Sequence, residues 1–238
     1  MSIISEFLVK EQKTVGIEFT PHMLEQFETY ARLLAEWNEK MNLTAIIKPE
    51  EIAAKHFLDS LMIMKYQMFK AGDRLADIGT GAGFPGIPLL IVCPELKLTL
   101  IDSLNKRLIF LEHVLKTVGL QAELVHARGE EAGRKKEYRQ KFDFTIARAV
   151  SHLRELSEYT LPLLKNGGKL ISMKGPQPAQ EIEEAKKAIH LLGGELQTVE
   201  TYFVPNAGER SLIFVKKISQ TPPIYPRPSA KIAKFPLK

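Results

Sequence analysis

The chain has 238 residues, of which 45% are hydrophobic and 26% are charged. These values are typical of a folded globular protein and exclude a chain that is disordered or fibrous throughout. The length suits one large domain, or one domain with an extension, rather than two equal domains. The single cysteine, Cys93, excludes an internal disulfide, so we expect a reduced, cytoplasmic compartment.

Positive charge is concentrated towards the C-terminal end. The formal net charge is +5, and residues 216–238 hold six basic residues and no acid, which leaves 27 basic against 28 acidic residues elsewhere. Such a segment either contacts a polyanion or keeps itself solvated. The longest apolar run, Ile87 to Cys93, is short and contains Pro88, and the first residues lack a basic export signal, so we expect no membrane partner.

Residues 1–66 are expected to form a helical extension packed on the main body. Thr20 and Pro21 suit the N-cap and the first position of a helix, and apolar residues then recur every three or four positions on one face. This stripe, which we expect to pack in the core, comprises Met23, Phe27, Tyr30, Leu34 and Trp37. A second helical stretch is expected after Pro49.

Residues 67–217 are expected to form an α/β domain, because short apolar strands alternate with helices. The expected strands are 75–78, 97–101, 122–126, 142–147, 169–173, 196–204 and 211–216, and the expected helices are 87–92, 106–118, 153–164 and 182–192. Helix-length crossovers predict a mostly parallel sheet covered on both faces, and the short link between the last two strands predicts an antiparallel hairpin. Residues 218–238 contain five prolines and are expected to form an extended basic tail.

A glycine-rich loop follows the first of these strands and opens a helix. Residues 77–86 read Asp-Ile-Gly-Thr-Gly-Ala-Gly-Phe-Pro-Gly. Glycines at 79, 81 and 83 allow a sharp turn and the close approach of a ligand, which in a doubly wound sheet binds at the carboxyl ends of the strands. The spacing Gly81-x-Gly83-x-x-Gly86 also matches the dinucleotide fingerprint, so an NAD-linked dehydrogenase is one interpretation.

Physical chemistry favours S-adenosyl-L-methionine over NAD at this loop. A pyrophosphate needs free N–H groups at the start of the helix, whereas Pro85 and Pro88 remove two donors there. Asp77 adds a negative charge, which suits the ammonium and sulfonium groups of S-adenosyl-L-methionine and would repel a pyrophosphate.

Three further positions near strand ends are candidate cofactor contacts. Asp102 ends the second strand, where a carboxylate accepts hydrogen bonds from a ribose diol, and capping of the following helix is its alternative role. The segment Arg128-Gly129-Glu130 follows the third strand, where a loop can pass the adenine. Arg148 follows the fourth strand.

The chain lacks the residues that several other reactions would need. An adenine amino-group methyltransferase would have an Asn/Asp-Pro-Pro-aromatic motif after the fourth strand, where this chain has Ala147-Arg148-Ala149-Val150. Cys93 lies in the first crossover, far from that edge, which disfavours a cytosine C5 enzyme with a cysteine nucleophile. The six histidines show no close pairing, so no bound metal is expected.

Motifs over nearly the whole chain match one family, and the glycine loop with Pro85 and Pro88 is the most specific of them. The matching segments are Asn42-Leu43-Thr44, His56-Phe57-Leu58-Asp59-Ser60, Asp77 to Pro88, Asp102-Ser103, Lys106-Arg107, Phe110-Leu111, Arg128-Gly129-Glu130, Phe142-Asp143, Ala147 to Val150, Lys174-Gly175, Glu209-Arg210 and Tyr225-Pro226-Arg227. In these segments the chain resembles the RsmG (glucose-inhibited division protein B, GidB) family of bacterial 16S rRNA guanine-N7 methyltransferases.

The resemblance implies a class I methyltransferase (Rossmann-like) fold with an N-terminal helical cap. It also implies S-adenosyl-L-methionine as the methyl donor and, as the acceptor, a guanine in the 530-loop region of 16S rRNA, free or in the small ribosomal subunit. By position it implies cofactor contacts from Gly79, Phe84, Asp102, Gly129, Glu130 and Arg148, to which the loop itself adds Asp77, Gly81 and Gly83. It implies RNA contacts from Lys106, Arg128, Lys174, Arg210 and Arg227.

The chain departs from the family pattern at two places. Gly129 stands where members commonly have alanine, and the tail after Arg227 lacks the usual glycine and a second adjacent basic residue. The first is a mild change, whereas the second bears on the contacts of the tail.

Guanine N7 carries an unprotonated lone pair at neutral pH, so we expect neither a catalytic base nor a covalent intermediate and assign no catalytic side chain. Catalysis then depends on positioning and electrostatics. Besides the dehydrogenase, the alternatives are an RNA-binding protein without catalytic activity and a methyltransferase of proteins or small molecules. We expect a monomer.

Overall fold

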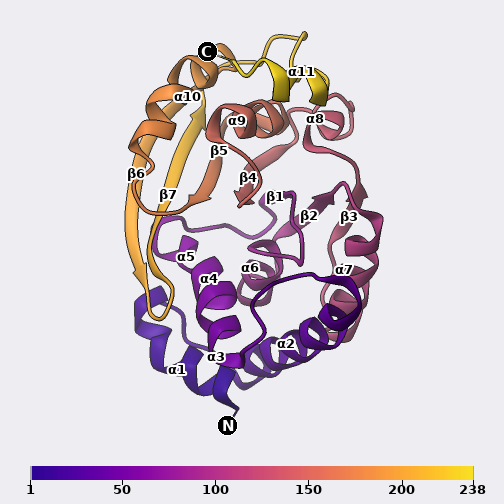
Figure 1. Ribbon diagram of the computed structural model, residues 1–238, viewed down its shortest axis with the longest axis vertical. Coiled ribbons are helices and arrows are strands. Elements are labelled where there is room, and N and C mark those ends of the chain that lie inside the picture. Colours follow the sequence, from indigo (N-terminus) through magenta and orange to yellow (C-terminus); the bar gives the residue numbers. More distant parts are fainter. Residues whose placement is uncertain (1, 238) are drawn as a thin grey trace.

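The computed structural model describes residues 2–237, which form one seven-stranded sheet with helices on both faces (Figure 1). The strand order is β3-β2-β1-β4-β5-β7-β6. The strands are β1 (Arg74–Ile78), β2 (Lys97–Asp102), β3 (Glu123–His126), β4 (Phe142–Arg148), β5 (Leu164–Lys174), β6 (Gly194–Val204) and β7 (Gly208–Lys217). Strands β1 to β5 pair in parallel, whereas β7 is antiparallel to both β5 and β6. The expected mostly parallel sheet with an antiparallel hairpin is confirmed.

Alternation along the strands divides the core into two layers, one on each face of the sheet. Leu75 and Leu100 belong to one layer, whereas their neighbours Ala76 and Ile101 belong to the other. The first layer includes helices α1 (Ile3–Val15), α2 (Pro21–Met41), α6 (Gly86–Val92) and α7 (Asn105–Thr117), and the second includes α8 (Gly129–Ala132), α9 (Leu153–Thr160) and α10 (Ala179–Leu191).

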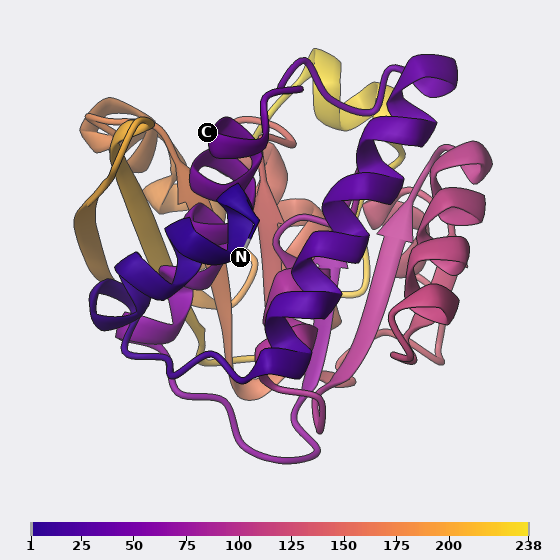
Figure 2. The same cartoon turned by 90° about the horizontal axis from the view of Figure 1, so that it is seen from below.

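The N-terminal helices lie together on one side of the sheet, as Figure 2 shows from below. Thr20 accepts a hydrogen bond from the backbone N of Met23 at 3.2 Å, so it is the N-cap of α2 as predicted. The stretch after Pro49 is helical as expected, but it is divided into four pieces. These are α3 (Pro49–Ile52), the π-helix η1 (Ala53–Leu58), α4 (Asp59–Leu61) and α5 (Ile63–Tyr66). A π-helix is rare and frequently marks a functional site.

The helix expected over 153–164 ends earlier, at Thr160. Because Pro162 has no N–H and restricts the residue before it, the chain passes into a short 3-10 turn, η2 (Leu161–Leu163). Strand β5 therefore begins at Leu164, earlier than expected, and its register against β4 is irregular at that end.

The expectation of an extended C-terminal tail is wrong. Residues 218–237 include a helix, α11 (Ser229–Lys234), which packs on α9 and buries Ile232 completely. The prolines offer carbonyl oxygens but no N–H groups, so this segment cannot continue the sheet. Its carbonyl oxygens instead accept hydrogen bonds from the domain, since Arg139 donates to the carbonyl oxygen of Thr221 at 2.9 Å.

Arg227 anchors this segment to the domain, so replacing its side chain should destabilise the fold. Its guanidinium pairs at 2.7 Å with Glu158, whose side chain is 1% exposed. Because Arg227→Met leaves a buried carboxylate without its partner, we expect the free energy of unfolding to fall by about 3 kcal/mol. Urea denaturation measures this change, and adding Glu158→Leu to the same chain should recover most of it. A loss below about 0.5 kcal/mol in the single variant would show that the pair does not hold the segment.

Candidate functional site

The glycine-rich loop joins β1 to α6 and is anchored by Asp77, which lies in β1 just before the loop. The Asp77 side chain is fully buried, and its Oδ2 accepts hydrogen bonds from Thr80 Oγ1 at 2.8 Å and from Gly86 N at 2.9 Å. A Cβ on Gly86 would lie 2.8 Å from the same oxygen, so only glycine lets the start of the helix approach this carboxylate. Burial outweighs the two hydrogen bonds and raises the pKa of Asp77 to about 7.

Tyr30 of α2 supports the loop from the N-terminal side. Its hydroxyl donates to the carbonyl oxygen of Ala82, and its ring stacks on Phe84 with the ring centres 5.3 Å apart. Gly83 has a φ of +98°, and a Cβ there would lie 2.6 Å from the Tyr30 hydroxyl. Sequence periodicity identifies Tyr30 only as a core residue, so its contact with the loop could be found only in the fold.

A cavity of about 450 Å³ opens at the carboxyl ends of β1, β2 and β4, and we name it the carboxyl-edge cavity. Gly79 follows β1, Asp102 ends β2, and Gly129 and Glu130 begin α8, so four of the predicted cofactor contacts line it. Helix α11 forms part of its wall. The structure thus brings together residues that are far apart in the chain, as expected for a ligand site in a doubly wound sheet.

Three carboxylates, those of Asp102, Glu130 and Glu155, line this cavity together with Arg107 and Arg128. Glu130 is buried, and within residues 2–237 its Oε1 has no hydrogen-bond partner, which is costly unless a ligand donates to it. Asp102 is already engaged, because its Oδ2 accepts from Gly81 N at 2.9 Å and pairs with Arg107 at 3.2 Å. Asp102 is not the N-cap of α7, a position that Leu104 occupies.

A second cavity, of about 380 Å³, is lined by residues of η1, of the end of β4 and of the β6–β7 hairpin. We name it the Arg148 cavity, and its lining includes His56, Asp59, Arg148, Lys174, Tyr202 and Arg210. Arg148 was expected beside the cofactor. The structure places its side chain in this second cavity, which is not the one that Gly79, Asp102 and Glu130 line.

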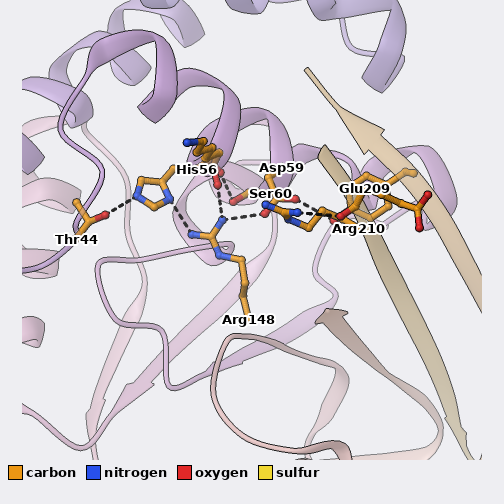
Figure 3. A network of polar contacts seen from close by, with 9 residues as sticks. Thr44, His56, Asp59, Ser60, Arg148, Glu209 and Arg210 are labelled. Atoms are coloured by element: carbon orange, nitrogen blue, oxygen red, sulfur yellow. Dashed lines mark hydrogen bonds and ion pairs between the residues drawn. The ribbon is translucent and has the colours of Figure 1, made fainter. Parts of the chain in front are cut away.

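A network of polar contacts holds the Arg148 guanidinium (Figure 3). Nη1 donates to Asp59 Oδ2 and to the carbonyl oxygen of Lys55, both at 3.0 Å, and Nη2 donates to His56 Nδ1 at 3.2 Å. The guanidinium carbon lies 5.0 Å from the ring centre of Phe84, on which His56 also stacks. Burial, reinforced by the Arg148 charge, lowers the pKa of His56 to about 3, so the imidazole is neutral.

Most contacts of this network cannot be predicted from the sequence. The hydroxyl of Tyr202 donates to Asp59 Oδ1 at 2.9 Å, across 143 positions of the chain, and no local signal predicts such a contact. His56 and Asp59 are three positions apart on one helical stretch, a spacing that places them on one face. That spacing is the one local signal in the sequence for this network.

The five basic residues predicted to contact RNA occupy different settings. Lys106 on α7 and Arg128 before α8 are exposed, and Arg128 donates a hydrogen bond to Ser229 Oγ of α11 at 3.3 Å. Lys174 and Arg210 line the Arg148 cavity, whereas Arg227 is held in the ion pair described above. The structure therefore brings Lys174 and Arg210 together at one cavity, whereas Arg128 lines the carboxyl-edge cavity.

Within residues 2–237, no helix has both the length and the apolar character needed to cross a bilayer. These residues also contain no group of three or more His, Cys, Asp or Glu side chains placed to hold a metal ion.

Asp77 should make the stability of the fold depend on pH. Its pKa is about 7 in the folded protein and about 4 in an unfolded chain, so the folded state keeps an extra proton between these values. The free energy of unfolding should therefore fall as the pH rises from about 4 to about 7, by a contribution on the order of 4 kcal/mol. Asp77→Asn should remove that contribution, which is measured by urea denaturation of both proteins at several pH values. Equal slopes would contradict a protonated Asp77.

Solved structures share this fold at low sequence identity. TrmN from Thermus thermophilus superposes with a TM-score of 0.54 at 16% identity, over 70% of this chain and 53% of that one. A SAM-dependent O-methyltransferase from Thermotoga maritima gives 0.52 at 18% identity, over 79% and 72%. TYW2 from M. jannaschii, solved in complex with AdoMet, gives 0.50 at 15% identity, over 86% and 80%. The class I methyltransferase fold that the sequence predicts is confirmed.

Curated relatives match over nearly the whole chain. Proteins named ribosomal RNA small subunit methyltransferase G from Lachnoclostridium phytofermentans and Brevibacillus brevis are 47% and 49% identical, over 94% and 93% of this chain and 94% of each relative. That of Desulforamulus reducens is 45% identical over 100% of both chains. The family model of rRNA small subunit methyltransferase G (GidB) matches residues 23–213. The chain therefore belongs to the rRNA small subunit methyltransferase G (GidB) family.

Proposed function

We propose that this protein transfers a methyl group from S-adenosyl-L-methionine to N7 of a guanine in the 530-loop region of 16S rRNA. Membership of a family of rRNA methyltransferases supports the reaction class. The observation that carries the assignment to particular residues is the carboxyl-edge cavity, where the glycine loop meets Asp102 and Glu130. The substrate is 16S rRNA, free or in the small ribosomal subunit, and the protein acts in the cytoplasm.

The residues of the carboxyl-edge cavity fit this cofactor. Glu130 Oε1 is a buried acceptor without a partner in the described chain, and the cofactor carries hydroxyl and amino donors as well as positive charge. At Gly79 an added Cβ would lie 2.8 Å from Val150, so the backbone at this position leaves no room for a side chain. In this proposal Gly79, Asp102, Gly129 and Glu130 contact the cofactor directly. Gly81, Gly83, Phe84 and Asp77 act by shaping the loop.

The hydrogen bonds of the loop disfavour a dinucleotide. Pro85 has no N–H, Gly86 N donates to Asp77 at 2.9 Å, and Ile87 N donates to the carbonyl oxygen of Gly83 at 2.8 Å. A pyrophosphate would therefore find these donors already occupied at the start of α6. Family and fold agree, since both belong to methyltransferases and not to dehydrogenases.

The chemistry requires little of the protein besides positioning. When bound, S-adenosyl-L-methionine supplies an activated methyl group, and N7 of guanine offers its lone pair without losing a proton. Glu130 and Asp102 bind and orient the donor. Asp77 and Tyr30 keep the loop between them in one shape, so little reorganisation is needed during the reaction.

The chain organisation fits the same proposal. Residues 1–66 act as a helical cap, residues 67–217 form the catalytic domain, and residues 218–238 form a basic segment that closes part of the cofactor site through α11. The helical cap supplies Tyr30 to the loop and His56 to the Arg148 cavity.

Methyl transfer tests the reaction and its target together. Labelled S-adenosyl-L-methionine is incubated with the protein and with either small subunits or naked 16S rRNA, each from a strain lacking this activity. We expect label at a single guanine of the 530 loop, mapped by chemical cleavage at N7-methylguanine. Any product excludes an RNA-binding protein without catalytic activity. No transfer by a protein that binds the cofactor would overturn the proposed acceptor.

Glu130 should contribute directly to cofactor affinity. Glu130→Gln removes the charge and one acceptor, so we expect the Kd for S-adenosyl-L-methionine to rise about tenfold in calorimetry. The matched control is Glu112→Gln, a change at an exposed position of α7, which should leave the Kd unchanged. An unchanged Kd in the Glu130 variant would exclude this carboxylate as a cofactor contact.

A further inference from the structure

The Arg148 cavity adjoins the carboxyl-edge cavity. Ala149 lines both, and Lys174 of the first cavity donates at 2.6 Å to the carbonyl oxygen of Ser151, which lines the second. Ala149 has a φ of +56°, in the left-handed region that a residue with a Cβ seldom adopts. Strained backbone of this kind persists mainly at binding and active sites. A molecule in the Arg148 cavity is therefore next to whatever occupies the carboxyl-edge cavity.

The polar network uses only part of the hydrogen-bonding capacity of Arg148. A guanidinium carries five N–H groups. Nη1 donates one hydrogen bond to Asp59 and one to the Lys55 carbonyl oxygen, which uses both of its hydrogens. Nη2 donates one hydrogen bond to His56. Nε–H and the second Nη2 hydrogen have no acceptor in the part of the chain that the structure describes. A residue that lines the cavity thus keeps spare donors in a fixed orientation.

His56 and Thr44 fix that orientation. Because His56 Nδ1 accepts from Arg148, the ring proton is on Nε2, which donates to Thr44 Oγ1 at 2.8 Å. The pKa of about 3 keeps the imidazole neutral at physiological pH, so this tautomer persists. These contacts give a physical role to Thr44 and His56, which belong to two segments, 42–44 and 56–60, that the sequence connects to the family only by resemblance.

The charge of the Arg148 cavity suits a polyanion. Its charged lining residues are Lys55, Asp59, Arg148, Lys174 and Arg210, four cations and one acid. Lys55 pairs with Glu51 at 2.7 Å and Lys174 with Glu181 at 2.5 Å. The Arg210 guanidinium, by contrast, donates to the backbone carbonyl of Glu209 and has no carboxylate partner among residues 2–237. Arg210 is therefore available to bind a phosphate.

We propose, building on the function proposed above, that the Arg148 cavity is the acceptor site and that Arg148 selects guanine over adenine. The spare N–H groups of Arg148 donate to guanine O6, whereas adenine presents a donor, its amino group, at the same position. A cavity of about 380 Å³ accommodates one base turned out of the RNA, with Arg210 on a neighbouring phosphate. Since N7 and O6 share one edge of guanine, holding O6 at Arg148 brings N7 to the common wall at Ala149. His56 and Thr44 act as positioning residues.

The test compares bases at the target position with the intact protein. RNA fragments containing the 530 loop carry guanine, hypoxanthine, which keeps O6, or 2-aminopurine, which lacks it. We expect kcat/KM for methyl transfer to fall on the order of 100-fold with 2-aminopurine and by less than about tenfold with hypoxanthine. Similar values for guanine and 2-aminopurine in the wild-type protein would overturn the inference and leave the proposed function intact. No transfer to the guanine RNA would instead contradict the proposed function.

Variants connect this preference to Arg148. In Arg148→Met the kcat/KM values for the guanine RNA and the 2-aminopurine RNA should differ by no more than about threefold, because no donor then contacts O6. Arg32→Met, at an exposed ion pair of α2, is the matched control and should keep the wild-type ratio. A ratio that survives in Arg148→Met would also overturn the inference.

Thr44→Val covers the case in which Arg148→Met does not fold. It leaves the Arg148–Asp59 pair in place but removes the acceptor of His56. We expect it to lower the guanine to 2-aminopurine ratio without changing the Kd for S-adenosyl-L-methionine, whereas Thr44→Ser, which keeps the hydroxyl, should restore the ratio. A wild-type ratio in Thr44→Val would contradict the positioning role and, with it, the fixed donors that the inference requires.

Discussion

The partly buried guanidinium of Arg148, whose side chain is 17% exposed, constrains much of the structure around it. A cation largely removed from water must be paired and hydrogen-bonded, and the partners of Arg148 come from distant parts of the chain. The π-helix η1 supplies the Lys55 carbonyl and His56, α4 supplies Asp59, and Tyr202 of β6 holds Asp59 in turn. The N-terminal cap, the end of β4 and the C-terminal hairpin are therefore tied to one another around the Arg148 cavity.

The glycine loop is held in a similar way, by one group on each side. Asp77 binds the two ends of the loop from within the sheet, and Tyr30 reaches Ala82 from the helical cap. Phe84 lies where these constraints meet, since it stacks on both Tyr30 and His56 and underlies Arg148. A reaction that depends on placing two partners, rather than on a catalytic base, benefits from such rigidity, because the polar groups are oriented before the substrates arrive.

The parts of the structure that follow local rules could be predicted from the sequence. Strand and helix periodicity predicts the sheet, and the rule that ligands bind at carboxyl strand ends predicts that Gly79, Asp102 and Glu130 meet. Contacts between distant elements could not be predicted. The direction of the Arg148 side chain depends on partners in η1 and α4. Composition alone predicts an extended tail for residues 218–237, because it does not reveal the hydrogen bond from Arg139 or the ion pair with Glu158 that hold this segment on the domain.

In the reaction proposed above, donor and acceptor occupy two cavities that meet at Ala149. The most direct measurement is a crystal structure of the protein with S-adenosyl-L-homocysteine. We predict that the adenosyl group lies in the carboxyl-edge cavity beside Glu130 and that the sulfur faces Ala149 and the Arg148 cavity. A ligand bound elsewhere, or a sulfur directed away from Ala149, would show that donor and acceptor do not meet at this residue.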